Sequence, residues 1–439
     1  MTWKVSLAAL ALTLAACAEP EDPKPAPPRP VRAVLFPYIP DTVGDGFASL
    51  KARLEADFER EHSDIDLDIV FDANLDTYDL ADDGVLSQLL GSGPAAAQVV
   101  EVDTLILGSL ASKGWIQPVD MEPDTVHPAA EEAVRISGTS YGVPTYLCTY
   151  VVYSRTTNIR SATDGASLVD LLRASAPGKR PLAANFSGSW TLPSSYLDAW
   201  RDTHPASALP SALALPLDST ALASFETVVD SCASAPGVNP CLDGDYADNT
   251  AAEEAFAQEQ ANGFIGYTER LATILKARPG MALPEVISVP LGKGSATTVF
   301  VDALVVNASC TGQCAEDARA FTSFLGSPRV RSLIAFSGEG PRGTLPRYLL
   351  QANRAFYQLE PARSDSMYRQ FAPLIDGARP FPSQGFPESR KALQAALMEA
   401  LRDTRQGGMG TDVRAERPAV GRGAGRIDTS KREDYVVRQ

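Results

Sequence analysis

Short β-type runs alternate with helical stretches in the N-terminal part of the sequence, and this alternation constrains the fold most. The β-type runs occupy 31–38, 65–71 and 98–102. Between the first two, apolar residues recur three or four positions apart and mark one helical face: Phe47, Leu50, Leu54 and Phe58. This order predicts α/β layers with a largely parallel sheet. Ligands bind beyond the carboxyl ends of strands in such sheets, where Tyr38 and Asp103 fall.

The second half of the sequence continues in the same style. β-type runs occupy 151–153, 264–269 and 299–306, and apolar stripes predict helices around 321–325 and 393–401. The region 31–403 suits two lobes better than a single hydrophobic core. Beyond residue 403 the chain is rich in Gly and Arg and poor in apolar residues, which predicts a flexible tail over 404–439.

The N-terminus has the features of an export signal. Lys4 precedes an apolar run over 5–16, which is shorter than the roughly 20 residues that a membrane-spanning helix needs. Leu14-Ala15-Ala16-Cys17 has the order of a bacterial lipobox. We therefore interpret 1–17 as a lipoprotein signal peptide whose Cys17 receives the lipid, with an ordinary secretory signal as the alternative.

Prolines dominate the segment that follows the signal. Six of them lie between positions 20 and 30, which predicts a semi-rigid tether over 18–30. No later stretch of the sequence is apolar enough over a sufficient length to span a bilayer. We expect an exported protein that is anchored to a bacterial membrane through its lipid alone, on the periplasmic or cell-surface side.

Charge and histidine content limit the kinds of partner. The sequence has 54 acidic and 39 basic residues and a formal net charge of −15, which argues against nucleic acid and suits a neutral or cationic small ligand. Solubility alone accounts for much of this acidity. The three histidines, His62, His127 and His204, are scattered without ligand spacing, so we expect no metal site and no cofactor. We also expect a monomer.

Four of the six cysteines form two local pairs. Cys232 and Cys241 flank a turn-rich loop, and Cys310 and Cys314 flank Thr311-Gly312-Gln313. Each pair closes a short loop that glycine or proline can bend, so we expect two disulfides. A redox pair at Cys310 and Cys314 is an alternative, although the spacing differs from the CxxC of thioredoxin-like sites.

Cys148 remains once the other cysteines have been assigned. It lies in an apolar and aromatic stretch, 141–150, near the middle of the chain. A thiol left over in an oxidising compartment is a liability unless its chemistry is used, which makes Cys148 a candidate nucleophile. The alternative is a buried structural thiol, because cysteine is among the most buried residue types.

The alternating elements of an exported chain of this length resemble the bi-lobed solute-binding proteins of ABC importers. The resemblance rests on Val99-Val100-Glu101-Val102-Asp103-Thr104 through Gly114-Trp115-Ile116-Gln117-Pro118-Val119, and on Tyr141-Gly142-Val143-Pro144. It implies two α/β lobes around a central cleft, a periplasmic-binding-protein-like fold. We expect lobe I at approximately 31–148 and 269–328, and lobe II at approximately 149–268 and 329–403.

Four segments resemble a more specific family within that fold, thiaminase I (thiamine pyridinylase), and keep its order across 31–306. Gly142-Val143-Pro144 with Leu147-Cys148-Thr149 is similar to its nucleophile segment, and Gly266-Tyr267-Thr268-Glu269 to the segment with its glutamate. Phe36-Pro37-Tyr38-Ile39-Pro40-Asp41 resembles its first strand and tyrosine-bearing loop, and Phe300-Val301-Asp302-Ala303-Leu304 its aspartate-bearing strand.

This resemblance implies a transferase that cleaves thiamine. Cys148 is the implied nucleophile: it adds to the pyrimidine, the thiazole leaves, and an amine or thiol co-substrate takes its place. Glu269 is the implied base. The resemblance also implies that Asp302 binds the amino-pyrimidine, and that Tyr38 and Tyr267 offer aromatic faces to the rings or to the thiazolium charge.

Three further residues are substrate-binding candidates. Asp103 is one because it lies at a strand end. Phe300 stands where the family has a tyrosine, and Tyr78 and Tyr246 are candidates by position only. These differences from the family concern the fit of the substrate more than the chemistry.

Each of these residues also has a structural explanation. Glu269, followed by Arg270, is suited to the first turn of a helix. Asp103 is suited to capping a helix that begins at Thr104, and Tyr38 to packing a proline-bounded turn. Asp302 is harder to explain in this way, because a carboxylate inside an apolar strand is costly unless it is paired or used.

Two other functions stand beside the transferase. One is a non-catalytic solute-binding lipoprotein that delivers a thiamine-like or other small ligand to an ABC importer. The other is a surface interaction module without a small ligand. Cys148 and Glu269 together favour the transferase, because a pure receptor needs neither a nucleophile nor a base.

Overall fold

A computed structural model describes residues 26–407, apart from 73–74, 123, 206–208, 236, 248–249 and 292–296, and gives only the backbone of 403–407. The predicted signal peptide with Cys17, most of the tether and residues 408–439 lie outside these residues. None of the described helices combines the length and the hydropathy that crossing a bilayer requires.

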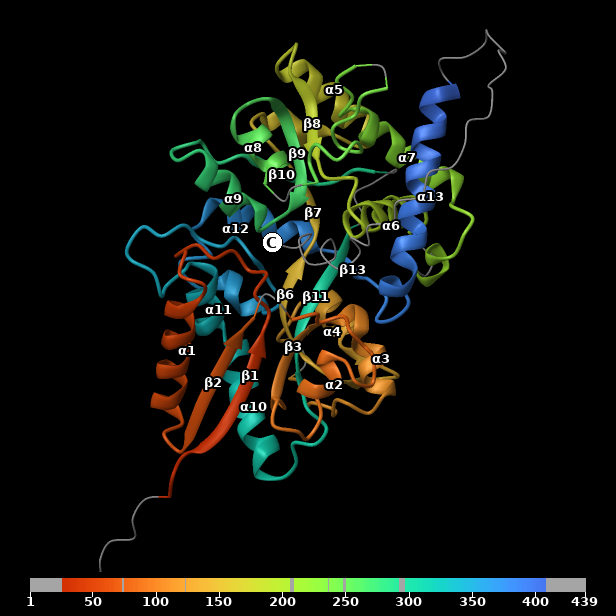
Figure 1. The fold of residues 1–439 in the computed structure, drawn as a ribbon. Coiled ribbons are helices and arrows are strands. Elements are labelled where there is room, and N and C mark those ends of the chain that lie inside the picture. Colours follow the sequence, from red (N-terminus) through yellow and green to blue (C-terminus); the bar gives the residue numbers. More distant parts are fainter. Residues whose placement is uncertain are drawn as a thin grey trace, which may run out of the picture.

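Two mixed β-sheets, each flanked by helices, define two lobes (Figure 1). Among the described residues, the lobe I sheet has the order β12-β6-β11-β3-β1-β2, and β13 also pairs with β11. Its strands are β1 (Arg29–Leu35), β2 (Ile65–Phe71), β3 (Val99–Asp103), β6 (Val143–Cys148), β11 (Thr298–Val306), β12 (Leu350–Gln351) and β13 (Arg379–Pro380). The lobe II sheet has the order β10-β7-β9-β8, built from β7 (Tyr150–Ser154), β8 (Arg180–Ala184), β9 (Ala261–Tyr267) and β10 (Glu285–Ser288). A small hairpin joins β4 (Arg135–Ile136) and β5 (Thr139–Ser140).

Helices cover both sheets. Those on lobe I are α1 (Ala48–Glu61), α2 (Val85–Leu89), α3 (Leu107–Ser112), α4 (Pro128–Ala133), α10 (Gln313–Gly326) and α11 (Pro328–Ala335). Those on lobe II are α5 (Gly165–Ser175), α6 (Thr191–Thr203), α7 (Ser219–Asp230), α8 (Ala251–Ala257), α9 (Arg270–Ala277), α12 (Ser366–Phe371) and α13 (Phe386–Gly407). Short 3-10 helices span Thr104–Ile106, Thr157–Ser161, Leu209–Leu213, Arg354–Gln358 and Ala372–Ile375.

The predicted apolar stripes form the helix contacts of lobe I. Leu50, Leu54 and Phe58 are buried on α1. The ring of Phe58 meets Phe321 and Phe324 of α10 edge-on, with centroids 5.7 and 5.3 Å apart. The apolar residues that recur three or four positions apart therefore form the face by which α1 packs on α10, although the two helices are distant in the chain.

The expectation of a largely parallel lobe I sheet was wrong. β1 runs parallel to β2 and β3, but β11 runs antiparallel to both β3 and β6. The reason is the path of the chain. β3 and β6 run toward lobe II, whereas β11 enters from lobe II and runs away from it, so it must oppose its neighbours (Figure 1).

Two short strands correct the predicted lobe boundaries. β10 lies in the segment assigned to lobe I but pairs with β7 of lobe II. β12 lies in the segment assigned to lobe II but pairs with β6 of lobe I. Strands this short carry too few residues for a recognisable alternation. At the ends, β1 begins at Arg29, inside the predicted tether, and α13 continues through 404–407 of the predicted tail.

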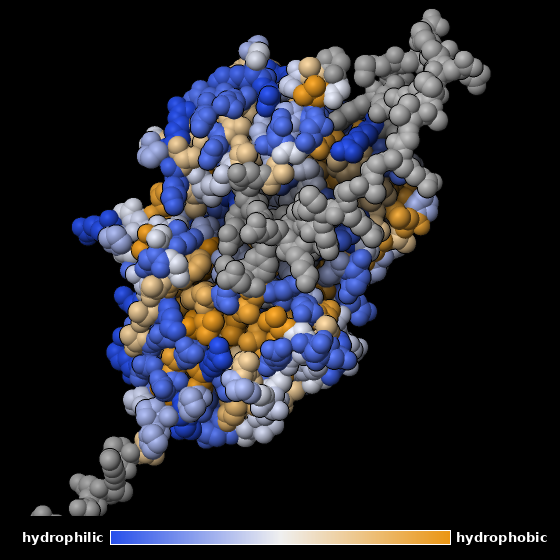
Figure 2. All heavy atoms as spheres, in the orientation of Figure 1, coloured by the Kyte–Doolittle hydropathy of each residue, from blue (hydrophilic) through white to orange (hydrophobic). Residues whose placement is uncertain are grey.

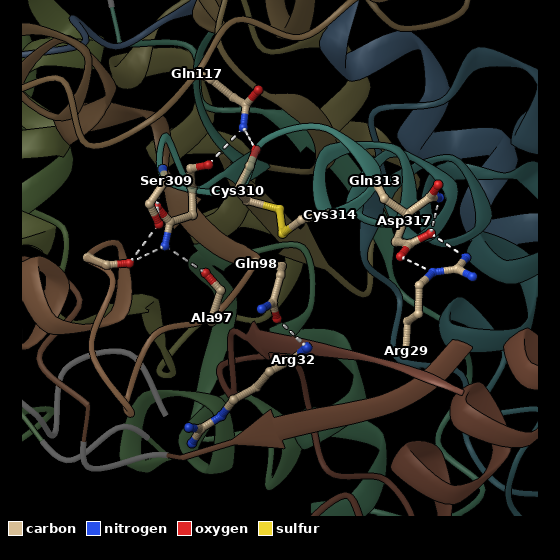
Figure 3. Close-up of a disulfide and its surroundings, with 12 residues drawn as sticks. Arg29, Arg32, Ala97, Gln98, Gln117, Ser309, Cys310, Gln313, Cys314 and Asp317 are labelled. Carbon is tan, nitrogen blue, oxygen red and sulfur yellow. Dashed lines mark hydrogen bonds and ion pairs between the residues drawn. A yellow bond between two sulfur atoms is a disulfide. The ribbon is translucent and has the colours of Figure 1, made fainter. Parts of the chain in front are cut away.

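Both expected disulfides are present. Cys232 and Cys241 have Cα atoms 5.9 Å apart, and those of Cys310 and Cys314 are 5.2 Å apart. Figure 3 shows the second bridge beside Gln117, whose amide nitrogen donates to the Cys310 carbonyl at 2.7 Å. This bridge follows the carboxyl end of β11, which points away from lobe II. Cys148 lies at the opposite end of the sheet.

The surface differs between the outside of the lobes and their junction. In Figure 2 hydrophilic residues cover most of the outer surface, and hydrophobic residues gather on lobe I next to the place where the lobes meet. Apolar surface is costly to expose, so its position near a junction is typical of a region that meets a ligand or another part of the protein.

Candidate active site

Cys148 lies where the chain passes from one lobe to the other. It is the last residue of β6, and β7 begins at Tyr150. Its Cα partner across the sheet is Phe300 of β11, the strand by which the chain returns to lobe I. Cys148 is half-buried and lies outside both disulfides. The nucleophile candidate is thus held by two neighbouring strands at the junction of the lobes.

Glu269 reaches Cys148 from lobe II. The Cys148 Sγ donates toward the Glu269 carboxylate, with Sγ 3.5 Å from Oε1 and 3.6 Å from Oε2. Glu269 stands two residues after β9, whose last residue, Tyr267, pairs with Tyr150 of β7. The pairing of β7 with β9 therefore carries Glu269 to the thiol although 121 residues separate the two in sequence. A thiol within hydrogen-bond reach of a carboxylate is the arrangement of an activated nucleophile.

Tyr153 holds the backbone next to Glu269 in place. The Tyr153 hydroxyl donates to the Thr268 carbonyl at 2.7 Å, and both residues are completely buried. Burial, and then the nearby Glu269 carboxylate, raises the pKa of Tyr153 well above its ordinary value, so the hydroxyl remains a donor. Glu269 occupies the N-cap of α9, but its side chain makes no capping hydrogen bond there. Its side chain is turned toward the thiol.

A pocket that is partly open to solvent surrounds this pair. It draws residues from both lobes, and it includes five of the candidates: Tyr38, Cys148, Tyr267, Glu269 and Asp302. The other lining residues are Phe36, Ile39, Tyr146, Leu147, Arg270, Phe300 and Leu349. Aromatic faces and carboxylates around one thiol suit a flat, cationic small molecule.

Two aspartates lie side by side at the edge of this pocket. Asp302 of β11 is the direct cross-strand partner of Asp103 of β3. Like charges opposite one another are unfavourable unless each is compensated. Asp103 is compensated, because its carboxylate accepts from Leu105 N at 3.0 Å and from the Tyr78 hydroxyl at 2.9 Å. Asp103 thus caps the 3-10 helix that follows, and only Asp302 lines the pocket.

The two tyrosines in the pocket are oriented by their neighbours. The ring of Tyr267 stacks on Tyr150 with centroids 4.4 Å apart, and the Tyr150 hydroxyl donates to the Tyr267 hydroxyl at 2.8 Å. The Phe300 ring meets Tyr267 edge-on. On the lobe I side, Tyr38 packs on Phe36 at 4.2 Å. These contacts place aromatic faces on both sides of the pocket.

The remaining two tyrosine candidates lie elsewhere. Tyr78 binds Asp103 and packs on Trp190 of lobe II, with ring centroids 4.7 Å apart, so it bridges the lobes beside the pocket. Tyr246 accepts from Arg180 at 2.8 Å. Arg180 begins β8, and the carboxyl end of β9, its parallel neighbour, leads to the pocket. Tyr246 therefore lies toward the far end of the lobe II sheet, and the structure does not bring it to Cys148.

Tyr146 is a pocket residue that the sequence reasoning missed. It precedes Cys148 by two positions on β6, so strand alternation alone places both side chains on one face. The guanidinium of Arg331 donates to the Tyr146 hydroxyl at 2.9 Å and lies over its ring at 4.3 Å. Burial raises the pKa of Tyr146 to about 12. Strand alternation could have identified Tyr146 as a pocket residue. No local sequence pattern predicts that Arg331 binds it.

A buried carboxylate supports the lobe I side of the pocket. Glu101 of β3 accepts from Phe36 N at 3.0 Å and from the Thr145 hydroxyl at 2.6 Å. Burial raises its pKa, and Arg331 opposes that shift. Phe36 and Tyr146 both line the pocket, so this network fixes the wall that faces Glu269. Among the described residues, no group of three or more His, Cys, Asp or Glu side chains is arranged to hold a metal ion.

The sequence matches the profile of the bacterial extracellular solute-binding proteins over residues 52–341. The chain belongs to this family. Its two α/β lobes are the fold of these proteins, and membership in an extracellular family indicates export. A search of curated proteins returns no significant match to the sequence.

Solved structures of this fold include enzymes and binding proteins. Thiaminase I of Clostridium botulinum, in complex with thiamin, is 19% identical with a TM-score of 0.64, covering 86% of this chain and 100% of that one. Thiaminase I of Bacillus thiaminolyticus is also 19% identical, with a TM-score of 0.63 and coverage of 86% and 99%. The GacH receptor of Streptomyces glaucescens, studied with acarbose, is 17% identical, with a TM-score of 0.61 and coverage of 87% and 97%. Likeness at these identities shows the fold alone.

Proposed function

We propose that this solute-binding family member is a thiamine pyridinylase, a transferase that exchanges the thiazole of thiamine for an amine or a thiol. The contact of Cys148 Sγ with the Glu269 carboxylate, at 3.5 Å inside the inter-lobe pocket, carries the proposal. A receptor gains nothing from a half-buried thiol beside a carboxylate. An enzyme that forms a covalent intermediate requires both.

The proposed chemistry begins with the thiol. A cysteine with an ordinary pKa of about 8.5 is mostly protonated at neutral pH, so Glu269 takes its proton. The Cys148 thiolate then forms a bond to a pyrimidine ring carbon, and the displaced ring electron pair forms a double bond to the methylene carbon. The bond between methylene carbon and thiazolium nitrogen breaks with its electron pair on nitrogen, so the thiazole departs neutral. Glu269 passes its proton to solvent.

The acceptor completes the cycle in the reverse sense. Glu269 takes a proton from the amine or thiol, whose electron pair forms a new bond to the methylene carbon. The ring electrons return and break the bond to Cys148 Sγ, and the departing thiolate takes the proton from Glu269. The net change is one thiamine cation and one acceptor giving one substituted pyrimidine, one thiazole and one proton. No cofactor is required.

Substrate recognition in this proposal falls to the pocket walls. The faces of Tyr38 and Tyr267 attract the thiazolium, an interaction worth about 2 kcal/mol when desolvated. Asp302 accepts from the amino group of the pyrimidine. In the exported protein, Cys17 carries the lipid and the proline-rich segment before β1 is the tether, so the pocket operates at the membrane surface.

A receptor for a thiamine-like or other small ligand is the second candidate. It is favoured by the fold shared with proteins such as the maltose-bound MalE3 of T. maritima, which is 15% identical with a TM-score of 0.61 over 87% of this chain. The two candidates differ in what becomes of the ligand. A receptor returns it unchanged, and a transferase does not.

Incubation of the purified lipid-free protein with thiamine and aniline tests the proposal directly. We expect the aniline-substituted pyrimidine and free thiazole, both resolved by mass spectrometry. Recovery of unaltered thiamine from a protein that binds it would establish the receptor and remove the transferase. A Cys310→Ser/Cys314→Ser variant removes the disulfide at the end of the lobe I sheet opposite Cys148. It is the control for loss of sulfur outside the pocket and should retain turnover.

A further inference from the structure

The backbone that carries Tyr38 is fixed on both sides of this residue. Phe36 N donates to the Glu101 carboxylate at 3.0 Å, and the Pro40 carbonyl accepts from Nε of Arg347 at 2.9 Å. Glu101 and Arg347 are both buried, so water does not compete with these bonds. The two bonds hold the main chain in place, but they leave the direction of the Tyr38 ring open.

A hydroxyl of a neighbouring segment meets the outer end of that ring. The Tyr38 hydroxyl and Thr77 Oγ1 are 2.7 Å apart, and either oxygen can be the donor. Thr77 is buried, with 5% of its surface exposed. The Tyr38 ring also packs on Phe36, with centroids 4.2 Å apart and the planes tilted by 39°. A hydrogen bond depends more steeply on direction than ring packing does, so the Thr77 hydroxyl decides where the ring points.

Thr77 is held in turn by the residue that follows it. The Tyr78 hydroxyl donates to the Asp103 carboxylate at 2.9 Å, and the Tyr78 ring packs on Trp190 of lobe II at 4.7 Å. Tyr78 N donates to the Asp76 carboxylate at 3.0 Å, which bends the chain at this point. The described residues that line the inter-lobe pocket include Tyr38 but not Thr77. Thr77 can therefore act on a ligand only through the ring that it holds.

We propose that Thr77 is a positioning residue that sets the Tyr38 ring for the positive charge of the bound ligand. The inference rests on the proposed function for the identity of that ligand, thiamine, whose thiazolium carries the charge. An aromatic ring attracts a cation at its face and repels it at its edge. The same ring can thus favour or oppose a cation, according to its direction. A hydroxyl that fixes this direction determines selectivity for charge.

Two substitutions at position 77 separate the hydroxyl from the rest of the side chain. Thr77→Val removes the hydroxyl and keeps the shape, whereas Thr77→Ser keeps the hydroxyl. Both are added to Cys148→Ser, so that ligand binds without turnover and calorimetry gives Kd. We expect Kd for thiamine to rise about fivefold in Thr77→Val and to stay within about twofold in Thr77→Ser.

A neutral ligand shows whether the effect depends on charge. In 3-deazathiamine a carbon replaces the thiazolium nitrogen, so the ring carries no positive charge. Its Kd should change less than about twofold in both variants, because a neutral ring gains little from a tyrosine face that is directed at a cation. An equal rise for thiamine and 3-deazathiamine in Thr77→Val would show a loss of pocket structure and overturn the proposal.

Thr42→Val is the matched control. Thr42 lies four residues after Tyr38, and its Oγ1 is likewise 2.7 Å from a hydroxyl, that of Ser337. This bond joins two other segments and does not involve the Tyr38 ring. Kd for both ligands should stay within about twofold in Thr42→Val. A thiamine Kd that rises equally in Thr42→Val and Thr77→Val, or in neither, would also overturn the role of Thr77.

Crystal structures of the unliganded variants separate this proposal from the proposed function. The Tyr38 ring should change direction in Thr77→Val and keep it in Thr77→Ser and Thr42→Val. An unmoved ring in Thr77→Val would overturn the inference, whatever the protein binds. A moved ring, in a protein that does not bind thiamine or returns it unchanged in the presence of aniline, would overturn the transferase and retain the hold of Thr77 on Tyr38.

Discussion

The two lobes bring different groups to the same pocket. Lobe I supplies the thiol of Cys148 and the carboxylate of Asp302 from paired strands, backed by the buried charges of Glu101 and Arg331. Lobe II supplies Glu269 from the turn between β9 and α9, where the Thr268 carbonyl accepts from the Tyr153 hydroxyl and from Leu271 N. The thiol thus lies at the end of a strand, and the carboxylate lies in a connection between two elements. The contact between Cys148 and Glu269 joins the lobes, so it depends on the position of one lobe relative to the other.

The largest expected effect comes from removing the lobe I nucleophile. Cys148→Ser should lower turnover of thiamine by at least about a thousandfold, because a hydroxyl beside a carboxylate is a far weaker nucleophile than a thiol. Thiamine affinity, measured by calorimetry, should change only a few fold because the pocket walls stay intact. Turnover that survives this substitution would remove Cys148 from the chemistry.

The lobe II counterpart should have a smaller effect. Glu269→Gln is expected to lower kcat by about a hundredfold to a thousandfold, the usual contribution of a general base. The remaining rate should rise with pH up to the ordinary thiol pKa of about 8.5, because solvent must then remove the proton. A variant that keeps the kcat of the unaltered protein but binds thiamine weakly would instead make Glu269 a binding residue.

Asp302→Asn tests whether lobe I also orients the substrate. Loss of a charged acceptor should raise KM for thiamine about tenfold to thirtyfold, with kcat reduced less than KM is raised. Asp103→Asn is the matched comparison on the neighbouring strand. Since Asp103 is bound to Leu105 N and Tyr78, its replacement should affect stability more than KM. A larger rise in KM for Asp103→Asn than for Asp302→Asn would make Asp103 the substrate-binding residue and Asp302 the structural one.

The smallest effect on turnover is expected at a contact between the lobes. Asp198 of α6 is buried and accepts from Thr298 N, the first residue of β11, at 2.8 Å. Burial raises its pKa to about 7. The folded protein thus holds a proton that the unfolded chain releases near pH 4, so this group favours folding below about pH 4 and loses that contribution as the pH rises toward 7.

Asp198→Asn keeps the acceptor without the charge. It should raise the free energy of unfolding at pH 8 by about 1–4 kcal/mol, and by almost nothing near pH 4. Calorimetric melting at several pH values checks this, with turnover measured in parallel. A stability difference that does not grow with pH would show that Asp198 is not the titrating group.

Long strands could be predicted from the sequence, and short ones could not. Strands such as β2 and β11 were foreseen because seven or more residues of apolar pattern are unambiguous. β10 and β12, with four and two residues, were assigned to the wrong lobes. Their pairing partners, rather than their own residues, decide where they belong.

The contacts of the candidate site also could be predicted only in part. The contact between Cys148 and Glu269 spans 121 residues, and no local pattern announces it; only the family resemblance suggested it. Arg331 of α11, which donates to the Tyr146 hydroxyl, had no signal in the sequence. Asp103 was foreseen both as a cap and as a ligand contact, and the structure shows the cap. Tertiary contacts choose between roles that the sequence leaves open.

The position of Cys148 at the end of β6 has a consequence for its reactivity. The side chain is half-buried and lines the inter-lobe pocket, so a molecule that occupies this pocket also covers the sulfur. Oxidation of a thiol requires access to it as well as thiolate character. A ligand between the lobes would therefore protect an exported thiol for as long as it stays bound.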